Sequence, residues 1–164
     1  MNDKNNPKID PELLKEPVSC LALGFGTGLA PKAPGTFGTL VGIPLFLIIR
    51  SLPVTVYCLI TIILFVIGIW ICDQTARKLG VHDHPGIVWD EIVGYLVTMI
   101  MAPSGWLWVI IGFILFRIFD ILKPWPIKII DQRVSGGFGI MFDDLIAGFF
   151  ALICMRILSF VLQI

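Results

Sequence analysis

Charged side chains are concentrated between residues 116 and 144, in a stretch that joins two apolar segments. They are Arg117, Asp120, Lys123, Lys128, Asp131, Arg133, Asp143 and Asp144. Charges at a membrane surface or inside a helical bundle are costly unless they face each other, water, a metal ion or a charged ligand. We therefore interpret this stretch as part of a functional site. A loop whose basic residues only set the membrane topology would give the same pattern.

Eight acidic residues are expected to share one face of the protein: Asp73, Asp83, Asp90, Glu91, Asp120, Asp131, Asp143 and Asp144. Carboxylates this close repel one another unless a cation neutralises them. Oxygen ligands without histidine or thiolate favour Mg²⁺, Mn²⁺ or Ca²⁺. The pairs Asp90-Glu91 and Asp143-Asp144 are each expected to begin a helix, where the dipole favours carboxylates, and this alone would explain them. It does not explain Asp120, which we expect at a helix C-terminus.

A glycine- and threonine-rich segment, residues 24–39, precedes the first long apolar run. Its glycines allow backbone amides to approach a ligand, and Thr36 is expected to cap the next helix. An anion could then bind at that helix N-terminus. Close packing of helices at glycine explains the segment equally well. Together with the acidic residues and with Arg117 and Lys123, it indicates a phosphate site at a membrane surface.

The composition is typical of an integral membrane protein. Apolar residues make up 57% of the 164 residues and charged residues only 15%, whereas soluble proteins are ~45–50% apolar. The net charge of zero gives no basic surface for nucleic acid. The four cysteines are scattered without a Cys-x-x-Cys pair, which predicts free buried thiols.

The apolar pattern predicts an all-α, polytopic membrane bundle of four to five apolar helices, with a re-entrant or interfacial N-terminal segment. We divide the chain into a polar N-terminal tail, residues 1–16, which is retained but frays, and a single membrane-embedded domain, residues 17–164. The third apolar segment, which Trp89 opens, is short for a span. The other expected spans are 36–49, 53–72, 106–116 and 145–162.

The lysines and arginines predict the orientation of these spans. With five spans, most of the basic residues and all eight acidic residues fall on one side, which the positive-inside rule places in the cytoplasm. Arg50 and Arg156 lie towards the other side, where Arg156 is expected to extend to the interface. The sequence therefore predicts one chemically active, cytoplasmic face.

Several phosphatase chemistries do not fit. Cys72 and Arg77 have four residues between them, whereas cysteine phosphatases need five. The Asp-x-Asp-x-Thr run is absent, and His82 and His84 lie outside any Ser-Gly-His run. A CDP-alcohol phosphatidyltransferase motif is matched only in a fragment, residues 73–77.

Four ordered motifs resemble the phosphatidylglycerophosphatase A family. They occupy residues 24–38, 88–91 (Val-Trp-Asp-Glu), 119–126 (Phe-Asp-Ile-Leu-Lys-Pro-Trp-Pro) and 136–144 (Gly-Gly-Phe-Gly-Ile-Met-Phe-Asp-Asp). The resemblance covers nearly the whole chain after Glu16, and departs from the family in having His84-Pro85 after Asp83. It implies a Mg²⁺-dependent lipid phosphatase of the bacterial inner membrane, which converts phosphatidylglycerophosphate to phosphatidylglycerol.

Joining the resemblance to the residue chemistry gives a set of expected roles. The expected catalytic residues are Arg117, Lys123, Asp90, Glu91, Asp120, Asp143 and Asp144. The expected Mg²⁺ ligands are the same five acidic residues with Asp73 in support. The expected phosphate-binding residues are Thr27, Gly28, Gly35, Thr36, Thr39, Lys123 and Arg133.

Two questions stay open from the sequence. Attack by water and an aspartyl-phosphate intermediate fit the same residues, and a homo-oligomer is compatible with the chain. An ion or proton carrier, or a membrane scaffold, is the alternative class of function. A carrier would be expected to place its acidic residues near mid-bilayer rather than on one face.

Overall fold

The computed structural model describes residues 7–81 and 84–162 and is helical, without strands in that part of the chain. Its elements are the 3₁₀ helices η1 (Pro11–Lys15) and η2 (Gly24–Leu29) and the α-helices α1 (Pro17–Ala22), α2 (Pro34–Ile49), α3 (Val54–Leu79), α4 (Trp89–Thr98), α5 (Trp106–Leu122), α6 (Ile127–Arg133) and α7 (Gly136–Leu162). The predicted all-α class is confirmed.

Two helices, α3 and α7, are long and apolar enough to cross a membrane. They have 26 and 27 residues, which at 1.5 Å per residue gives a length of about 40 Å. Large apolar side chains such as Ile62, Val66 and Trp70 are exposed along α3, as expected of a surface that faces lipid. The other apolar helices are shorter, so the expected number of four to five spans is not established by helix length.

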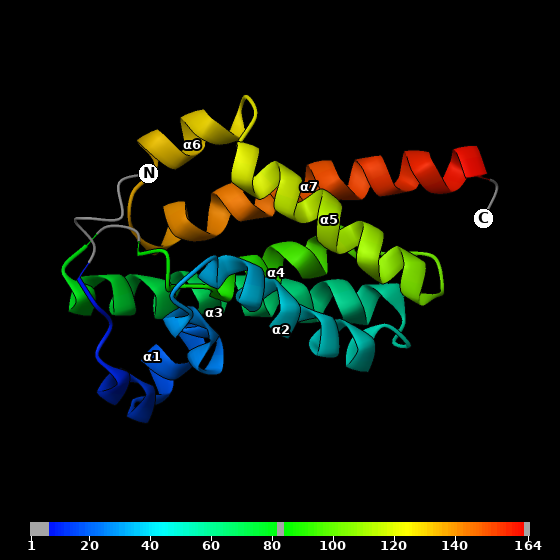
Figure 1. Ribbon diagram of the computed structural model, residues 1–164. Helices are drawn as coiled ribbons and strands as arrows, with labels where there is room; N and C mark the ends of the chain where they lie inside the picture. Colours follow the sequence, from blue (N-terminus) through cyan, green and yellow to red (C-terminus); the bar gives the residue numbers. More distant parts are fainter. Residues whose placement is uncertain (1–6, 82–83, 163–164) are drawn as a thin grey trace.

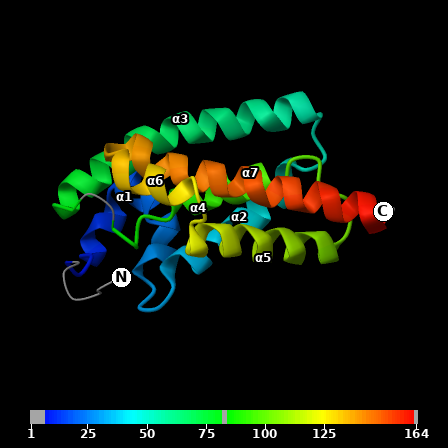
Figure 2. The same cartoon turned by 90° about the horizontal axis from the view of Figure 1, so that it is seen from above.

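The short helix α4 forms the centre of the bundle. Most of its side chains are buried, including Ile92, Tyr95 and Leu96, and it packs against α7, α2 and α3. In the view from above, α7 runs between α3 and α5 (Figure 2). A methyl group added at Gly148 of α7 would lie 2.5 Å from the carbonyl oxygen of Gly94 in α4. Glycine at position 148 therefore lets the two helix backbones touch.

The long helices run between two chemically different ends of the molecule. The connections between α2 and α3 and between α4 and α5 lie at one end, together with the end of α7 (Figure 1). At this end the guanidinium of Arg156 donates to the carbonyl of Met101, 2.9 Å away. The end of α3 and the beginning of α7 lie at the opposite end (Figure 1). That end carries the acidic residues discussed below.

Two predicted helix starts are wrong. Helix α7 begins at Gly136, so Asp143 and Asp144 lie inside it and not at its start. The carboxylate of Asp73 accepts a hydrogen bond from the backbone N–H of Gly137, at 3.2 Å, and satisfies one of the first amides of the helix. Helix α2 begins at Pro34, and its N-cap is Ala33, not Thr36. Proline is favoured at the first helical position because its fixed φ suits the helix.

The N-terminal tail, which was expected to fray, makes contacts with the bundle in residues 7–16. Glu16 forms an ion pair with Lys78 of α3, and its carboxylate accepts a hydrogen bond of 3.0 Å from the hydroxyl of Ser19. The imidazole of His84 lies 2.9 Å from the carbonyl oxygen of Pro7. These contacts hold the segment against the bundle. Residues 1–6, His82 and Asp83 lie outside the described residues, and the side chain of Asp131 is not described.

Candidate active site

Three carboxylates from two helices form a compact group, which we call the carboxylate cluster. One oxygen from each of Asp90, Glu91 and Asp144 lies within 4.8 Å of the other two. Asp90 and Glu91 stand in the first turn of α4, as expected from the sequence, and Asp144 comes from α7. Because the backbones of α4 and α7 are in contact near Gly94, the backbone positions that carry the three carboxylates are held close together.

The arginine of α5 lies beside the carboxylate cluster. Arg117 forms an ion pair with Asp120, one turn further along α5. Its Nη1 atom also lies 3.8 Å from Oε1 of Glu91. The three side chains are only 12–14% exposed, so water screens these charges weakly. Asp120 is therefore linked to the cluster through Arg117.

The adjacent residue of α7 makes a different contact. Oδ2 of Asp143 lies 2.5 Å from Nζ of Lys123, the residue that ends α5. Lys123 has a left-handed backbone conformation, with φ of 41°, which non-glycine residues adopt at an energetic cost. Successive residues of a helix point about 100° apart. Accordingly, Asp143 forms an ion pair with Lys123, whereas Asp144 belongs to the carboxylate cluster.

A glycine of α2 allows the cluster to be covered closely. A methyl group added at Gly35 would lie 2.0 Å from Oε1 of Glu91 and 3.0 Å from Nη1 of Arg117. Any larger residue at position 35 would therefore displace the glutamate. Gly35 was predicted to let a phosphate approach the backbone. In the structure it makes room for Glu91.

The carboxylate cluster is suited to a divalent cation. Oδ2 of Asp144 and Oε2 of Glu91 are buried, and neither has a hydrogen-bond partner among the described residues. Burial, followed by the charges of Asp144 and Asp120, raises the pKa of Glu91 well above its ordinary value. Buried carboxylates without donors are costly unless a cation is bound or a proton is taken up. The all-oxygen ligand set is compatible with Mg²⁺. Nε of Arg117 is also buried and has no hydrogen-bond partner among the described residues, so it could donate a hydrogen bond to a phosphate oxygen.

The remaining predicted site residues are placed as follows. Asp73 caps α7 and forms a 2.9 Å ion pair with Arg77, one turn further along α3. The hydroxyls of Thr27 and Thr39 donate to Gly24 and Gly35 of the preceding turn. Thr36 is half-buried, and Arg133 is exposed at the end of α6. The five acidic residues, Arg117 and Lys123 thus form the centre of the site, whereas Asp73 serves the helix start.

The glycine-rich segment has a packing role. A methyl group at Gly28 would lie 1.9 Å from the carbonyl oxygen of Gly86. Phe25 and Gly26 have positive φ values of 57° and 97°, a conformation that suits glycine. The segment therefore folds tightly against the turn at residues 84–86.

Comparison with known proteins places the chain in a family. The model of the family described as Phosphatidylglycerophosphatase A matches residues 20–159, which include the cluster and its neighbours. The chain belongs to the phosphatidylglycerophosphatase A family. It is 47% identical over 136 residues to a protein of that name from Escherichia coli, covering 82% of this chain and 79% of the relative. The relative of the same name from Haemophilus influenzae is 45% identical over 152 residues, covering 92% and 93%. No solved structure matches the chain significantly.

The family motifs coincide with the parts of the site. The Val-Trp-Asp-Glu motif supplies Asp90 and Glu91 of α4, and the motif at residues 119–126 supplies Asp120 and Lys123. The motif at residues 136–144 forms the first turns of α7 and ends in the two aspartates. His84, which the sequence analysis noted as a departure from the family pattern, lies outside the cluster, and its Nδ1 accepts a 3.0 Å hydrogen bond from the backbone N–H of Gly86.

Proposed function

We propose that this member of the phosphatidylglycerophosphatase A family hydrolyses the terminal phosphomonoester of phosphatidylglycerophosphate to give phosphatidylglycerol. The observation that carries the proposal is the carboxylate cluster of Asp90, Glu91 and Asp144, beside Arg117 and Lys123. The names of the two relatives agree with this substrate. The function is that of a lipid phosphatase in phospholipid biosynthesis.

The cofactor of the proposal is Mg²⁺. Asp90, Glu91 and Asp144 would hold it, with Asp120 and Asp143 as neighbouring carboxylates. When bound, Mg²⁺ polarises the phosphate and lowers the pKa of bound water. Buried carboxylate oxygens without hydrogen-bond partners support this assignment.

The protein side chains would orient and stabilise the phosphate. Arg117 approaches the cluster from α5, and Asp120 holds its guanidinium in place. The ammonium group of Lys123 is held by Asp143 in the same way. Fixed positive groups beside a transferring phosphoryl group stabilise the charge on its oxygens without rearranging during the reaction. Asp120 and Asp143 are thus proposed as residues that position the two cations.

The membrane arrangement is also a proposal. Helices α3 and α7 would cross the inner membrane, with the acidic end of the bundle in the cytoplasm. The diacylglycerol part of the substrate would remain in the bilayer, so that only its headgroup enters the site. Exposed apolar side chains along α3 and α7 support this arrangement.

The proposal is tested by phosphate release from detergent-dispersed phosphatidylglycerophosphate, with Mg²⁺ and with excess chelator. We expect turnover with Mg²⁺ only, and a loss of at least about 100-fold in Asp144→Asn, because even the loss of a residue that supports a metal ligand costs 10–100-fold. The matched control is Asp73→Asn, a carboxylate outside the cluster. Full turnover in chelator would refute the metal assignment.

The same preparation separates the alternatives. Ion flux in liposomes without phosphate release would indicate a carrier. A scaffold would show neither activity and would be indifferent to neutralising Asp90, Asp120 and Asp143 together. The stereochemical course at phosphorus distinguishes the two chemical routes. Direct attack by water is one displacement and inverts a phosphate made chiral with oxygen isotopes, whereas an aspartyl-phosphate intermediate requires two displacements and retains its configuration.

A further inference from the structure

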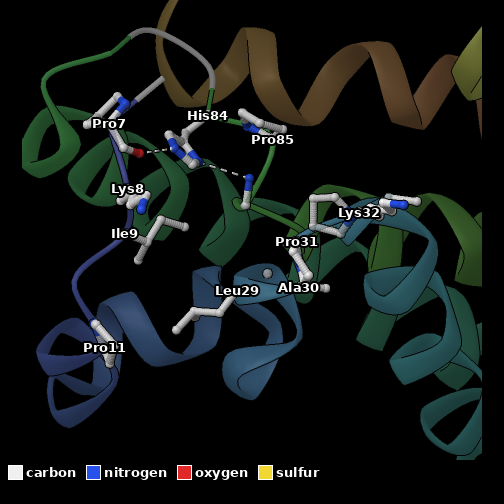
Figure 3. Close-up of a pocket in the computed structure, with 14 residues that line it drawn as sticks. Pro7, Lys8, Ile9, Pro11, Leu29, Ala30, Pro31, Lys32, His84 and Pro85 are labelled. Carbon is white, nitrogen blue, oxygen red and sulfur yellow. Dashed lines mark hydrogen bonds between the residues drawn. The ribbon is translucent and has the colours of Figure 1, made fainter. Parts of the chain in front are cut away.

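A cavity of about 730 Å³ lies outside the carboxylate cluster, between three segments that are distant in the sequence. Its walls come from the N-terminal segment, from the end of η2 with the following residues up to Pro34, and from the turn at residues 84–86. Figure 3 shows Lys8 on one wall and Lys32 on another, with His84 between the segments. The rest of the lining is mainly proline, glycine and aliphatic side chains.

The charged side chains among the described lining residues of the cavity are both lysines. Lys8 and Lys32 line it and are exposed. Within the described part of the chain, no carboxylate forms an ion pair with either lysine, whereas Lys15, Lys78 and Lys123 all have acidic partners. None of the described residues that line the cavity is acidic. A cavity of this kind favours an anion with several oxygen acceptors.

His84 connects two walls of the cavity through hydrogen bonds. Its Nδ1 atom accepts a hydrogen bond from the backbone N–H of Gly86, so Nε2 carries the proton and donates to the carbonyl of Pro7. His84 is 6% exposed. It therefore ties the segment that carries Lys8 to the turn that forms another wall. The close packing of Gly28 on Gly86 fixes the third wall.

Two of the walls continue directly into the active site. Three peptide units join Lys32 to Gly35, which packs on Glu91, so the two Cα atoms lie at most about 11 Å apart. Asp90 follows Gly86 by four residues through a buried segment, residues 87–89. The cavity is therefore a close neighbour of the carboxylate cluster.

We propose that this cavity is a second phosphate site, in which Lys8 and Lys32 bind a phosphate group beside the catalytic carboxylates. The ligand class follows from the charge and the position of the cavity. Its role, to receive inorganic phosphate released by hydrolysis, rests on the proposed function. The phosphate of an anionic lipid headgroup has the same chemistry and is the other source.

The test is lysine footprinting on the full-length protein in neutral detergent. The protein is acylated with acetic anhydride with and without inorganic phosphate, and each lysine is followed by mass spectrometry. We expect phosphate to protect Lys8 and Lys32, but not Lys15, which is exposed and paired with Glu12. Protection should weaken at high ionic strength. In nanodiscs without added phosphate, protection that requires phosphatidylglycerol would identify a lipid headgroup as the source.

Variants give an independent measurement. Inhibition of turnover by added phosphate should weaken about ten-fold for each lysine lost in Lys8→Gln and Lys32→Gln, as expected for one charge-assisted hydrogen bond. The control Lys15→Gln should be inhibited like the wild type. His84→Ala should release the N-terminal segment and so abolish the protection of Lys8 by phosphate. The protection of Lys32 should be reduced but not lost.

The outcomes separate this inference from the proposed function. If the protein releases phosphate from the lipid, but phosphate neither protects the two lysines nor inhibits less in the variants, the second site is refuted and the phosphatase remains. Equal protection of Lys15 refutes it as well. If phosphate protects the lysines of a protein that does not hydrolyse the lipid, the cavity binds phosphate and the proposed function is wrong.

Discussion

The ammonium of Lys123 and the carboxylate of Asp143 lie 2.5 Å apart and join the end of α5 to the interior of α7. The side chain of Asp143 is 7% exposed and that of Lys123 is 23% exposed. Water therefore screens the pair weakly, and each charge depends on the other.

Removing one partner of this pair should be more harmful than removing both. Lys123→Met or Asp143→Asn should each destabilise the protein by about 3 kcal/mol, because the remaining buried group loses its ion-pair partner. The double variant should recover part of that loss. Thermal unfolding of the four proteins in detergent gives the coupling free energy. Additive losses would show that the contact contributes nothing.

Asp73 should behave as a helix cap rather than a metal ligand. Asp73→Ala should lower the free energy of unfolding by about 1 kcal/mol, the usual effect of losing a cap. The Mg²⁺ concentration for half-maximal activity should stay within about two-fold of the wild type, since Asp73 bonds to Gly137 and Arg77. A Mg²⁺ titration of activity measures this. A large rise in the Mg²⁺ requirement would restore Asp73 to the metal site.

The space at Gly35 should be essential for the position of Glu91. Gly35→Ala places a methyl group 2.0 Å from Oε1 of the glutamate, so we expect activity and Mg²⁺ affinity to fall at least about ten-fold. Adding Glu91→Asp shortens the acidic side chain and should restore part of the affinity. Isothermal titration with Mg²⁺ tests both variants. If Gly35→Ala binds Mg²⁺ normally, the close contact has no functional role.

The raised pKa of Glu91 predicts how the metal-free protein responds to pH. Between the ordinary and the raised pKa, the folded protein binds more protons than the unfolded chain. The free energy of unfolding therefore falls as pH rises through this range. Thermal unfolding in chelator at several pH values should show this decline, and Mg²⁺ should stabilise the protein most at the higher pH. Glu91→Gln is the control and should show a weaker dependence on pH.

The sequence predicted those parts of the site that depend on local signals. Asp90 and Glu91 begin a helix as expected, and Asp120 lies in the last turn of α5, which ends at Leu122. The all-α class and the free cysteines follow from composition and are also confirmed, but only Cys72 of the four thiols is buried, so their predicted burial is wrong for the other three. The helix ends are set by residues that are neighbours in the chain.

The parts that sequence reasoning missed depend on contacts between distant residues. The start of α7 is fixed by Asp73, 64 residues earlier, so the run of glycines at 136–139 could not reveal that Asp144 is internal to a helix. Asp143 contacts Lys123 of the α5 end and Asp144 lies near Asp90 and Glu91 of α4, and this difference depends on which helix each side chain faces. The N-terminal segment is held by the contacts of Pro7 with His84 and of Glu16 with Lys78. No motif in the sequence indicates that these residues pair.

Helix α4 is surrounded by its neighbours along most of its length, and its backbone touches that of α7. Such an element cannot slide or tilt alone, because every displacement would have to be shared by the helices around it. The spacing of the three acidic groups is therefore a property of the whole bundle. If the cluster binds a metal ion as proposed, differences in ion size would have to be accommodated by side-chain rotation and by water, since the helices that carry the carboxylates cannot move independently.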